Sequence, residues 1–97
     1  MVKRVIWTRR AQNDRKAILT YWNERNQSKA YSKKLDQLLR HAIKIICNFP
    51  GIGKPTTDKD IRVKIVKDYL IIYRRVGSTI YILTVWDSRQ NPEKLDY

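Results

Sequence analysis

Basic side chains recur where three predicted strands lie side by side in the second half of the chain. Arg62 and Lys64 occupy alternate positions of one strand, so they share a face of it, roughly 6.5–7 Å apart. Arg74 and Arg75 end the next strand, and Arg89 follows the last one. Because such a cluster repels itself, we expect an anion to neutralise it, and a phosphate backbone suits that role.

Any catalysis by this set would depend on cations together with tyrosine or aspartate. A guanidinium or ammonium group stabilises a pentavalent phosphate, and a nearby cation lowers the pKa of a lysine or tyrosine toward use as a general base. The sequence offers no Ser-His-Asp or Cys-His set, and Gly51-Ile52-Gly53 fits neither glycine-rich phosphate motif. His41 and Cys47 lack companions at ligand spacing, so we expect neither a metal nor a cofactor.

The last predicted strand delivers an aromatic ring and an acid to the same region as Arg89. Trp86 and Asp87 end this strand, and Tyr97 is close to it at the C-terminus. Rings beside cations suit stacking on unpaired bases. We therefore predict that Trp86 and Asp87, with Arg74 and Arg75, contact nucleic acid.

The overall charge points to the same class of partner. The 97 residues contain 21 Lys and Arg against 9 Asp and Glu, which gives a net charge of +12. One domain spanning residues 1–97 is expected at this length, with nucleic acid or an acidic protein as its partner. The alternative is a basic surface that serves solubility alone. No signal peptide or apolar span of membrane length is present, so we expect a cytoplasmic protein without a membrane partner.

Hydrophobic periodicity predicts two helices and four strands. The helices cover Arg9 to about Arg25, with Thr8 as N-cap, and Lys29 to about Asn48, with Ser28 as candidate cap. The strands cover Val2–Trp7, Ile61–Val66, Tyr69–Arg75 and Thr79–Asp87, and residues 50–57 form a loop.

This order, β-α-α-β-β-β, predicts an α+β fold. The last three strands form an antiparallel meander, the N-terminal strand joins the same small sheet, and the helical hairpin packs on one face. The other face is then partly open. We expect Arg62 and Lys64 to project from this open face, because Ile61, Val63 and Ile65 point the opposite way.

Two segments, FPGIG after the second helix and IRVKIVKDYLIIYRRVGSTIYILTVWDSRQNP, resemble the RelE/ParE superfamily of toxins from bacterial type II toxin–antitoxin modules. The resemblance covers nearly the whole chain. It rests on the Pro-x-x-Gly turn, the strand that begins with an arginine, Tyr-x-x-x-Tyr-Arg and the late arginine. It implies a toxin whose partner is a cognate antitoxin protein.

The superfamily contains two activities. RelE-type members cut messenger RNA in the ribosomal A site, and their basic residues and tyrosine correspond to Arg62, Lys64, Arg89 and Tyr97 here. Leu70 stands where the RelE pattern has a further arginine. ParE-type members inhibit DNA gyrase, and the long helical hairpin and FPGIG turn are similar to theirs.

The resemblance leaves three functions open. Ribosome-dependent cleavage of messenger RNA is favoured by the placement of Arg62, Lys64 and Arg89. Non-catalytic inhibition of DNA gyrase is the alternative. A third possibility is a basic RNA-binding module without toxicity.

Overall fold

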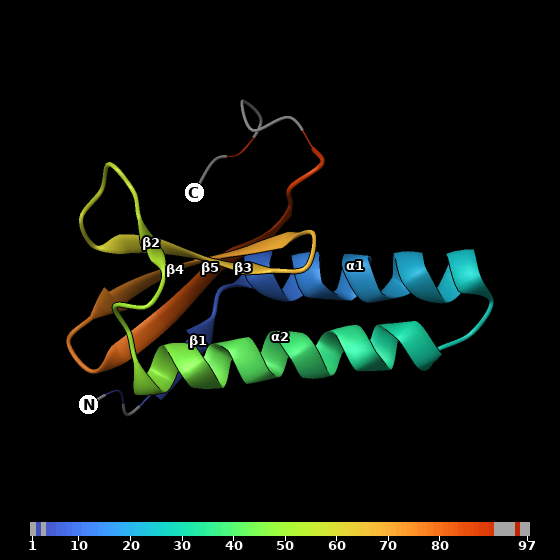
Figure 1. Cartoon of the computed structure of the whole chain (residues 1–97), viewed down its shortest axis with the longest axis horizontal. Coiled ribbons are helices and arrows are strands. Elements are labelled where there is room, and N and C mark those ends of the chain that lie inside the picture. The colour runs from blue at the N-terminus through green and yellow to red at the C-terminus, as the bar shows by residue number, and fades with distance from the viewer. Residues whose placement is uncertain (1, 3, 91–94, 96–97) are drawn as a thin grey trace.

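A strand, a helical hairpin and four further strands follow one another along the chain (Figure 1). The structure is a computed structural model, and it describes residues 2, 4–90 and 95. The elements are β1 (Arg4–Trp7), α1 (Arg9–Asn26), α2 (Ala30–Asn48), β2 (Lys54–Pro55), β3 (Ile61–Val66), β4 (Tyr69–Val76) and β5 (Thr79–Asp87). In the described part of the chain, neither helix combines the length and apolar character needed to span a membrane.

All five strands form one sheet in the order β1-β5-β4-β3-β2. β1 runs parallel to β5, and the other neighbours are antiparallel, so the predicted α+β fold is confirmed. β2 is an addition within the predicted loop at residues 50–57, where Lys54 pairs with Val63 and Pro55 with Arg62. This strand is at an edge, where a proline is tolerated because no further strand needs its missing N–H.

The helices begin and end through local hydrogen bonds. Thr8 caps α1 as predicted, because its hydroxyl accepts from the Ala11 N–H at 3.1 Å. The same hydroxyl lies 3.0 Å from the carbonyl of Ile82, so the cap also ties α1 to β5. α2 differs from the prediction, since Lys29 is its N-cap and makes no side-chain cap bond. Ser28 lies one residue earlier and accepts from the Ala30 N–H.

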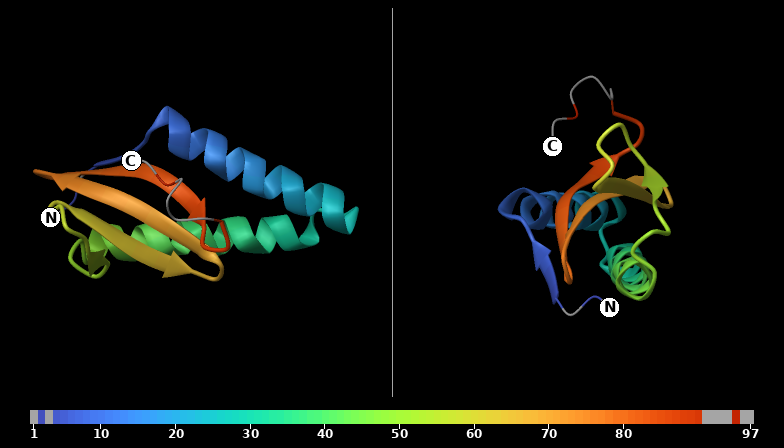
Figure 2. Two further views of the ribbon diagram at one scale, coloured as in Figure 1. Left: turned by 90° about the horizontal axis from the view of Figure 1, so that it is seen from above. Right: turned by 90° about the vertical axis from the view of Figure 1, so that its left-hand side faces the viewer.

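The core fills the space between the helical hairpin and one face of the sheet. α2 presents apolar residues at spacings of three and four, as helical periodicity requires. They pack with the inward-facing residues of the strands, and the core includes Leu35, Leu39, Ala42, Ile46, Ile71, Tyr73, Ile80, Ile82 and Val85. Figure 2 shows the long hairpin extending past the end of the sheet.

A β-bulge in β5 changes which side chains face the helices. Tyr73 pairs with Ile82 but its neighbour Ile72 pairs with Thr84, so Leu83 is the extra residue. Beyond the bulge, Val85 pairs with Ile71 and belongs to the core. The buried Thr84 hydroxyl donates to the Asp14 carboxylate at 2.6 Å, and the Val85 N–H donates to the same oxygen at 3.1 Å. The Asp14 carboxylate thereby joins α1 to the bulged part of β5.

Candidate functional site

Arg62 and Lys64 lie on the side of the sheet opposite to the one predicted. Arg62 pairs with Tyr73 and Lys64 with Ile71, and directly paired residues share a face. Tyr73 and Ile71 belong to the core beneath the helices. The two cations therefore project from the helix-covered face near its β3 edge. On the other face, Ile65 is 49% exposed. Alternation predicted that Arg62 and Lys64 share a face but assigned them to the wrong one.

The predicted cations are also divided between the two ends of the sheet. Arg62 lies opposite Tyr73 of β4, whereas Arg89 follows Asp87, which lies opposite Tyr69. Four residues of an extended strand separate these two levels by roughly 13 Å. Arg74 and Arg75 lie near the end of β4, close to Arg62, but successive side chains point to opposite faces. The five cations therefore do not all converge on one side or rim, although Arg62 and Arg75 line the same cavity.

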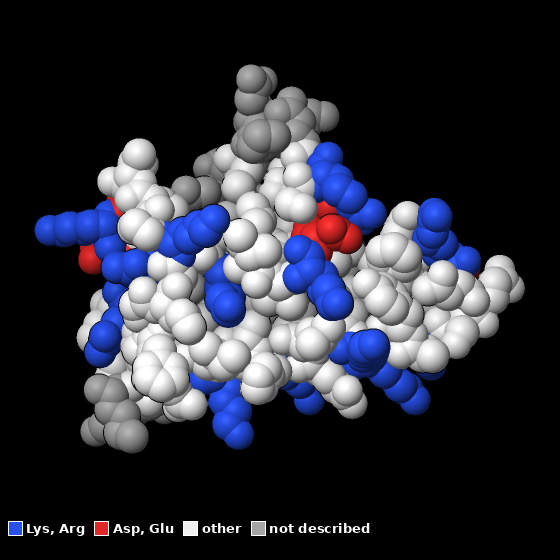
Figure 3. Space-filling model, viewed as in Figure 1, with Lys and Arg blue, Asp and Glu red and all other residues white. Residues whose placement is uncertain are grey.

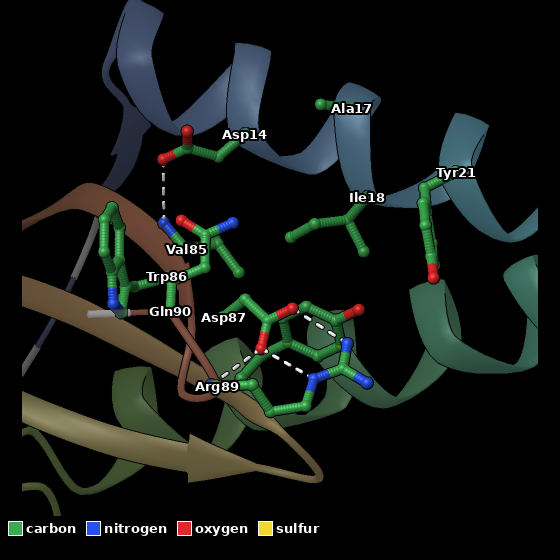
Figure 4. Close-up of a pocket in the computed structure, with 10 residues that line it drawn as sticks. Asp14, Ala17, Ile18, Tyr21, Val85, Trp86, Asp87, Arg89 and Gln90 are labelled. Atoms are coloured by element: carbon green, nitrogen blue, oxygen red, sulfur yellow. Dashed lines mark hydrogen bonds and ion pairs between the residues drawn. The ribbon is translucent and has the colours of Figure 1, made fainter. Parts of the chain in front are cut away.

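Arg89 lines a cavity of about 440 Å³ between α1 and the end of β5 (Figure 4). One wall comes from α1 and the other from the end of β5 and the turn after it. The lining residues are Asp14, Ala17, Ile18, Tyr21, Tyr69, Val85, Trp86, Asp87, Arg89 and Gln90. The cavity brings together Trp86, Asp87 and Arg89, three of the residues that the sequence predicted as functional.

Asp87 and Arg89 form a bidentate ion pair in this cavity. Arg89 Nε lies 3.0 Å from Asp87 Oδ1, and Nη2 lies 2.8 Å from Oδ2. The Arg89 backbone N–H also donates to Oδ1 at 2.9 Å. Hydrogen bonding from the Arg89 side chain lowers the pKa of Asp87 and raises that of Arg89. Arg89 is half exposed, and its charge is already balanced by Asp87.

The remaining polar groups of the cavity serve packing better than proton transfer. Trp22 Nε1 donates to the Tyr69 hydroxyl at 2.7 Å, and burial raises the pKa of Tyr69. A phenol with a raised pKa is a poor general base. Trp86 Nε1 is buried, with no hydrogen-bond partner among the described residues. A cavity lined by both apolar side chains and an ion pair suits binding of a partner side chain.

Sequence reasoning missed the contribution of α1 to this cavity. Asp14 and Tyr21 precede the β5 residues by more than half of the chain, and the spacing of α1 gives no sign of their role. Tyr69 of β4 lines the cavity from the core and is 2% exposed. Tyr97, predicted as catalytic, lies outside the described residues.

Arg62 lines a second, smaller cavity of about 280 Å³ at the other end of the sheet. Its lining residues are Pro50, Gly51, Lys59, Asp60, Arg62, Tyr73, Arg75 and Gly77. The FPGIG turn forms one wall and is fixed by the Tyr73 hydroxyl. That hydroxyl accepts from the Gly53 N–H at 2.9 Å and donates to the Pro50 carbonyl at 2.8 Å. Burial raises the pKa of Tyr73, so it is structural here.

Comparison with known proteins identifies relatives of the whole fold. The sequence model of the family described as "ParE toxin of type II toxin-antitoxin system, parDE" matches residues 5–92. A solved structure titled "Chromosomal ParDE TA system from P. aeruginosa" is similar, with a TM-score of 0.72 and 22% sequence identity. The alignment covers 88% of this chain and 94% of that one. No curated protein matches the sequence.

Proposed function

This chain belongs to the ParE toxin family of type II toxin–antitoxin systems, and on that premise we propose that it inhibits DNA gyrase by binding rather than by catalysis. The family implies a cognate antitoxin as partner. Gyrase inhibition by ParE-type toxins requires a contact surface and no reacting groups. Gyrase works in the cytoplasm, so the toxin acts there.

The observation that carries this proposal is the separation of Arg62 from Arg89. A nuclease that stabilises one phosphate in its transition state needs its cations within reach of the same atoms. Here Arg62 and Arg89 line different cavities, and the Arg89 guanidinium is already ion-paired with Asp87. The two tyrosines at these cavities, Tyr69 and Tyr73, have raised pKa values and hydrogen-bonded hydroxyls. These features support a binding surface better than a catalytic centre.

Ribosome-dependent cleavage of messenger RNA is the second candidate. Arg62 and Lys64 share one strand face, as the RelE pattern requires. That face is the helix-covered one, and Leu70 replaces a further basic residue of the pattern. A substrate strand would have to reach Arg62 and Lys64 along the edge of the sheet formed by β2 and the end of β3.

One pair of measurements separates the two functions. The purified chain is added to DNA gyrase in a supercoiling assay, and the 5′ ends of messenger RNA are mapped after induction in cells. We expect loss of supercoiling with no new RNA ends. New RNA ends that disappear in Arg62→Gln/Lys64→Gln, with supercoiling unaffected, would establish the nuclease function instead.

The antitoxin is proposed to cover the Arg89 cavity and the adjoining groove of the helical hairpin. Tyr21 at the cavity is 47% exposed, and Tyr31 on α2 is 36% exposed. Exposed aromatic rings of this kind are common at protein interfaces. An antitoxin segment rich in acidic residues would also offset part of the +12 charge.

A further inference from the structure

We propose that Lys59, Arg62 and Arg75 form a phosphate-binding site at the end of the sheet where β3 begins and β4 ends. The three cations line the cavity of about 280 Å³, which shares no residue with the cavity that contains Arg89. The set also differs from the one that the sequence predicted, because it includes Lys59 and excludes Lys64, Arg74 and Arg89. The inference does not rest on the gyrase proposal.

The sheet register brings the three side chains together. Arg62 lies directly opposite Tyr73, and Arg75 is two residues beyond Tyr73, so both arginines project from the same face. The Arg75 N–H lies 3.4 Å from the Asp60 carbonyl, which holds the segment before β3 beside the end of β4. Lys59 enters the cavity from this segment.

Both guanidinium groups are oriented by backbone carbonyls. Arg62 Nη1 donates to the Gly53 carbonyl at 2.8 Å, and Arg75 Nε donates to the Gly77 carbonyl at 2.9 Å. A guanidinium carries five N–H donors, so each of these bonds uses one and leaves most of the fork for a ligand. Side chains that are already oriented lose less entropy when they bind.

The positive charge of the cavity is only partly balanced by the residues that the structure describes. Asp60 also lines it, so three cations face one carboxylate. Among the described residues, ion pairs join Arg15 and Arg40 to Asp36 and Arg89 to Asp87, and none involves Lys59, Arg62 or Arg75. Cations that line one cavity repel one another, and an anion in the cavity reduces that cost.

A phosphate group is the anion that fits these donors. An arginine guanidinium donates two parallel hydrogen bonds to phosphate oxygens, and a lysine ammonium adds a compact positive charge. The cavity lies below the range of about 300–1,000 Å³ that is usual for drug-sized ligands, so it accepts a small group. A free phosphate compound and the backbone of DNA present the same chemistry.

The test uses the full chain and measures its binding both to a free phosphate compound and to DNA. Pyrophosphate is titrated while the backbone amide signals of Gly51, Gly53 and Gly77 are followed by NMR. Binding of a 12-base-pair DNA duplex is measured at several salt concentrations. We expect pyrophosphate to shift these three signals and Arg75→Gln to weaken its binding roughly 3- to 10-fold. If the site binds the phosphate backbone of DNA, Arg75→Gln also lowers, by about 1, the slope of the logarithm of duplex affinity against the logarithm of salt concentration.

A charge-matched control is needed because lysine and arginine side chains are scattered over the face seen in Figure 3. Lys34→Gln removes one positive charge from an exposed position on α2, away from the cavity. Its binding of pyrophosphate should match that of the unmodified chain. The proposal is overturned if Lys34→Gln or Arg74→Gln weakens pyrophosphate binding as much as Arg75→Gln does. It is also overturned if pyrophosphate leaves the three glycine signals unmoved. Melting temperatures verify that each variant is folded.

Discussion

Gly53 and Tyr73 explain at the level of single residues why the FPGIG turn has its sequence. A Cβ atom at Gly53 would lie 2.6 Å from the Tyr73 hydroxyl oxygen and 2.9 Å from its Cε1. Both distances are shorter than ordinary contacts, and Tyr73 is buried and cannot move aside. The close approach lets the Gly53 N–H reach the phenol oxygen.

Removal of the Tyr73 hydroxyl should therefore destabilise the turn. Tyr73→Phe leaves the buried Gly53 N–H and the Pro50 carbonyl without this partner, at an expected cost of about 1–3 kcal/mol. Gly53→Ala should cost at least as much, because the added methyl group displaces the ring. Urea unfolding measures both, with Gly51→Ala as control, since nothing lies within 4 Å of a Cβ at Gly51. Equal effects of the two glycine substitutions would contradict this account.

Arg89 controls the titration of Asp87. The ion pair and the backbone N–H of Arg89 lower the pKa of Asp87, so Arg89→Ala should raise it toward the ordinary value of about 3.9. An NMR titration of the side-chain carboxyl carbons measures the change. Asp36 is the internal reference, because its pKa is lowered by Arg15 and not by Arg89. An unchanged Asp87 pKa in the variant would mean that the pair does not form in solution.

At the scale of elements, ion pairs fasten the two helices together. Arg15 of α1 lies 2.6 Å from Asp36 of α2, and Arg40 adds a second contact from one turn later in α2. The hydrogen bonds from Arg15 lower the pKa of Asp36 below its ordinary value. A carboxylate with a lowered folded-state pKa stabilises the fold above its unfolded pKa, and this contribution is lost as pH falls through the folded value.

Asp36→Asn should consequently destabilise the protein by about 0.5–1 kcal/mol near neutral pH, a modest value because Arg15 is about one-third exposed. The difference from the unmodified chain should shrink below about pH 4 and vanish once Asp36 is protonated in both states. Urea midpoints at neutral and acidic pH measure this. A difference that persists undiminished in acid would mean that packing, and not the charge of Asp36, holds the helices.

The elements themselves were largely predictable, because both helices and the meander carry clear periodicities. β2 was missed because its two residues, Lys54–Pro55, carry no pattern. The face of Arg62 was assigned wrongly because alternation shows which residues share a face, but not which face the helices cover. The bulge at Leu83 has no sequence signal, although it decides which residues of β5 enter the core.

The candidate site was predictable only where it is local in sequence. Trp86, Asp87 and Arg89 were found because an apolar strand runs into a polar turn, and the structure places all three in one cavity. The α1 wall could not be found this way. Asp14 bonds to Thr84 across 70 positions of the chain, a contact that exists only after folding.

At the scale of the whole molecule, charge and shape both favour an extended acidic partner. The molecule measures 41 × 30 × 21 Å, and the hairpin projects beyond the sheet (Figure 1). Basic side chains are distributed along the face seen in Figure 3, and few acidic atoms interrupt them. A partner that crosses both cavities would meet an ion pair at the Arg89 cavity and a net positive charge at the cavity lined by Lys59, Arg62 and Arg75.

Association with the antitoxin should accordingly be accelerated by long-range attraction. A net charge of +12 steers an acidic partner, so we expect the association rate constant to fall at least 10-fold as salt rises from about 50 to 500 mM. The dissociation rate constant should change much less, because contacts already formed are partly shielded from salt. Stopped-flow mixing of toxin and antitoxin measures the first rate, and competition with unlabelled antitoxin measures the second.

Lys34→Gln should lower the association rate constant only slightly, since it removes one of many charges spread over the surface. An association rate that is independent of salt would show that the basic surface plays no part in capture, and the antitoxin would then have to be recognised through short-range contacts at the cavity beside Tyr21.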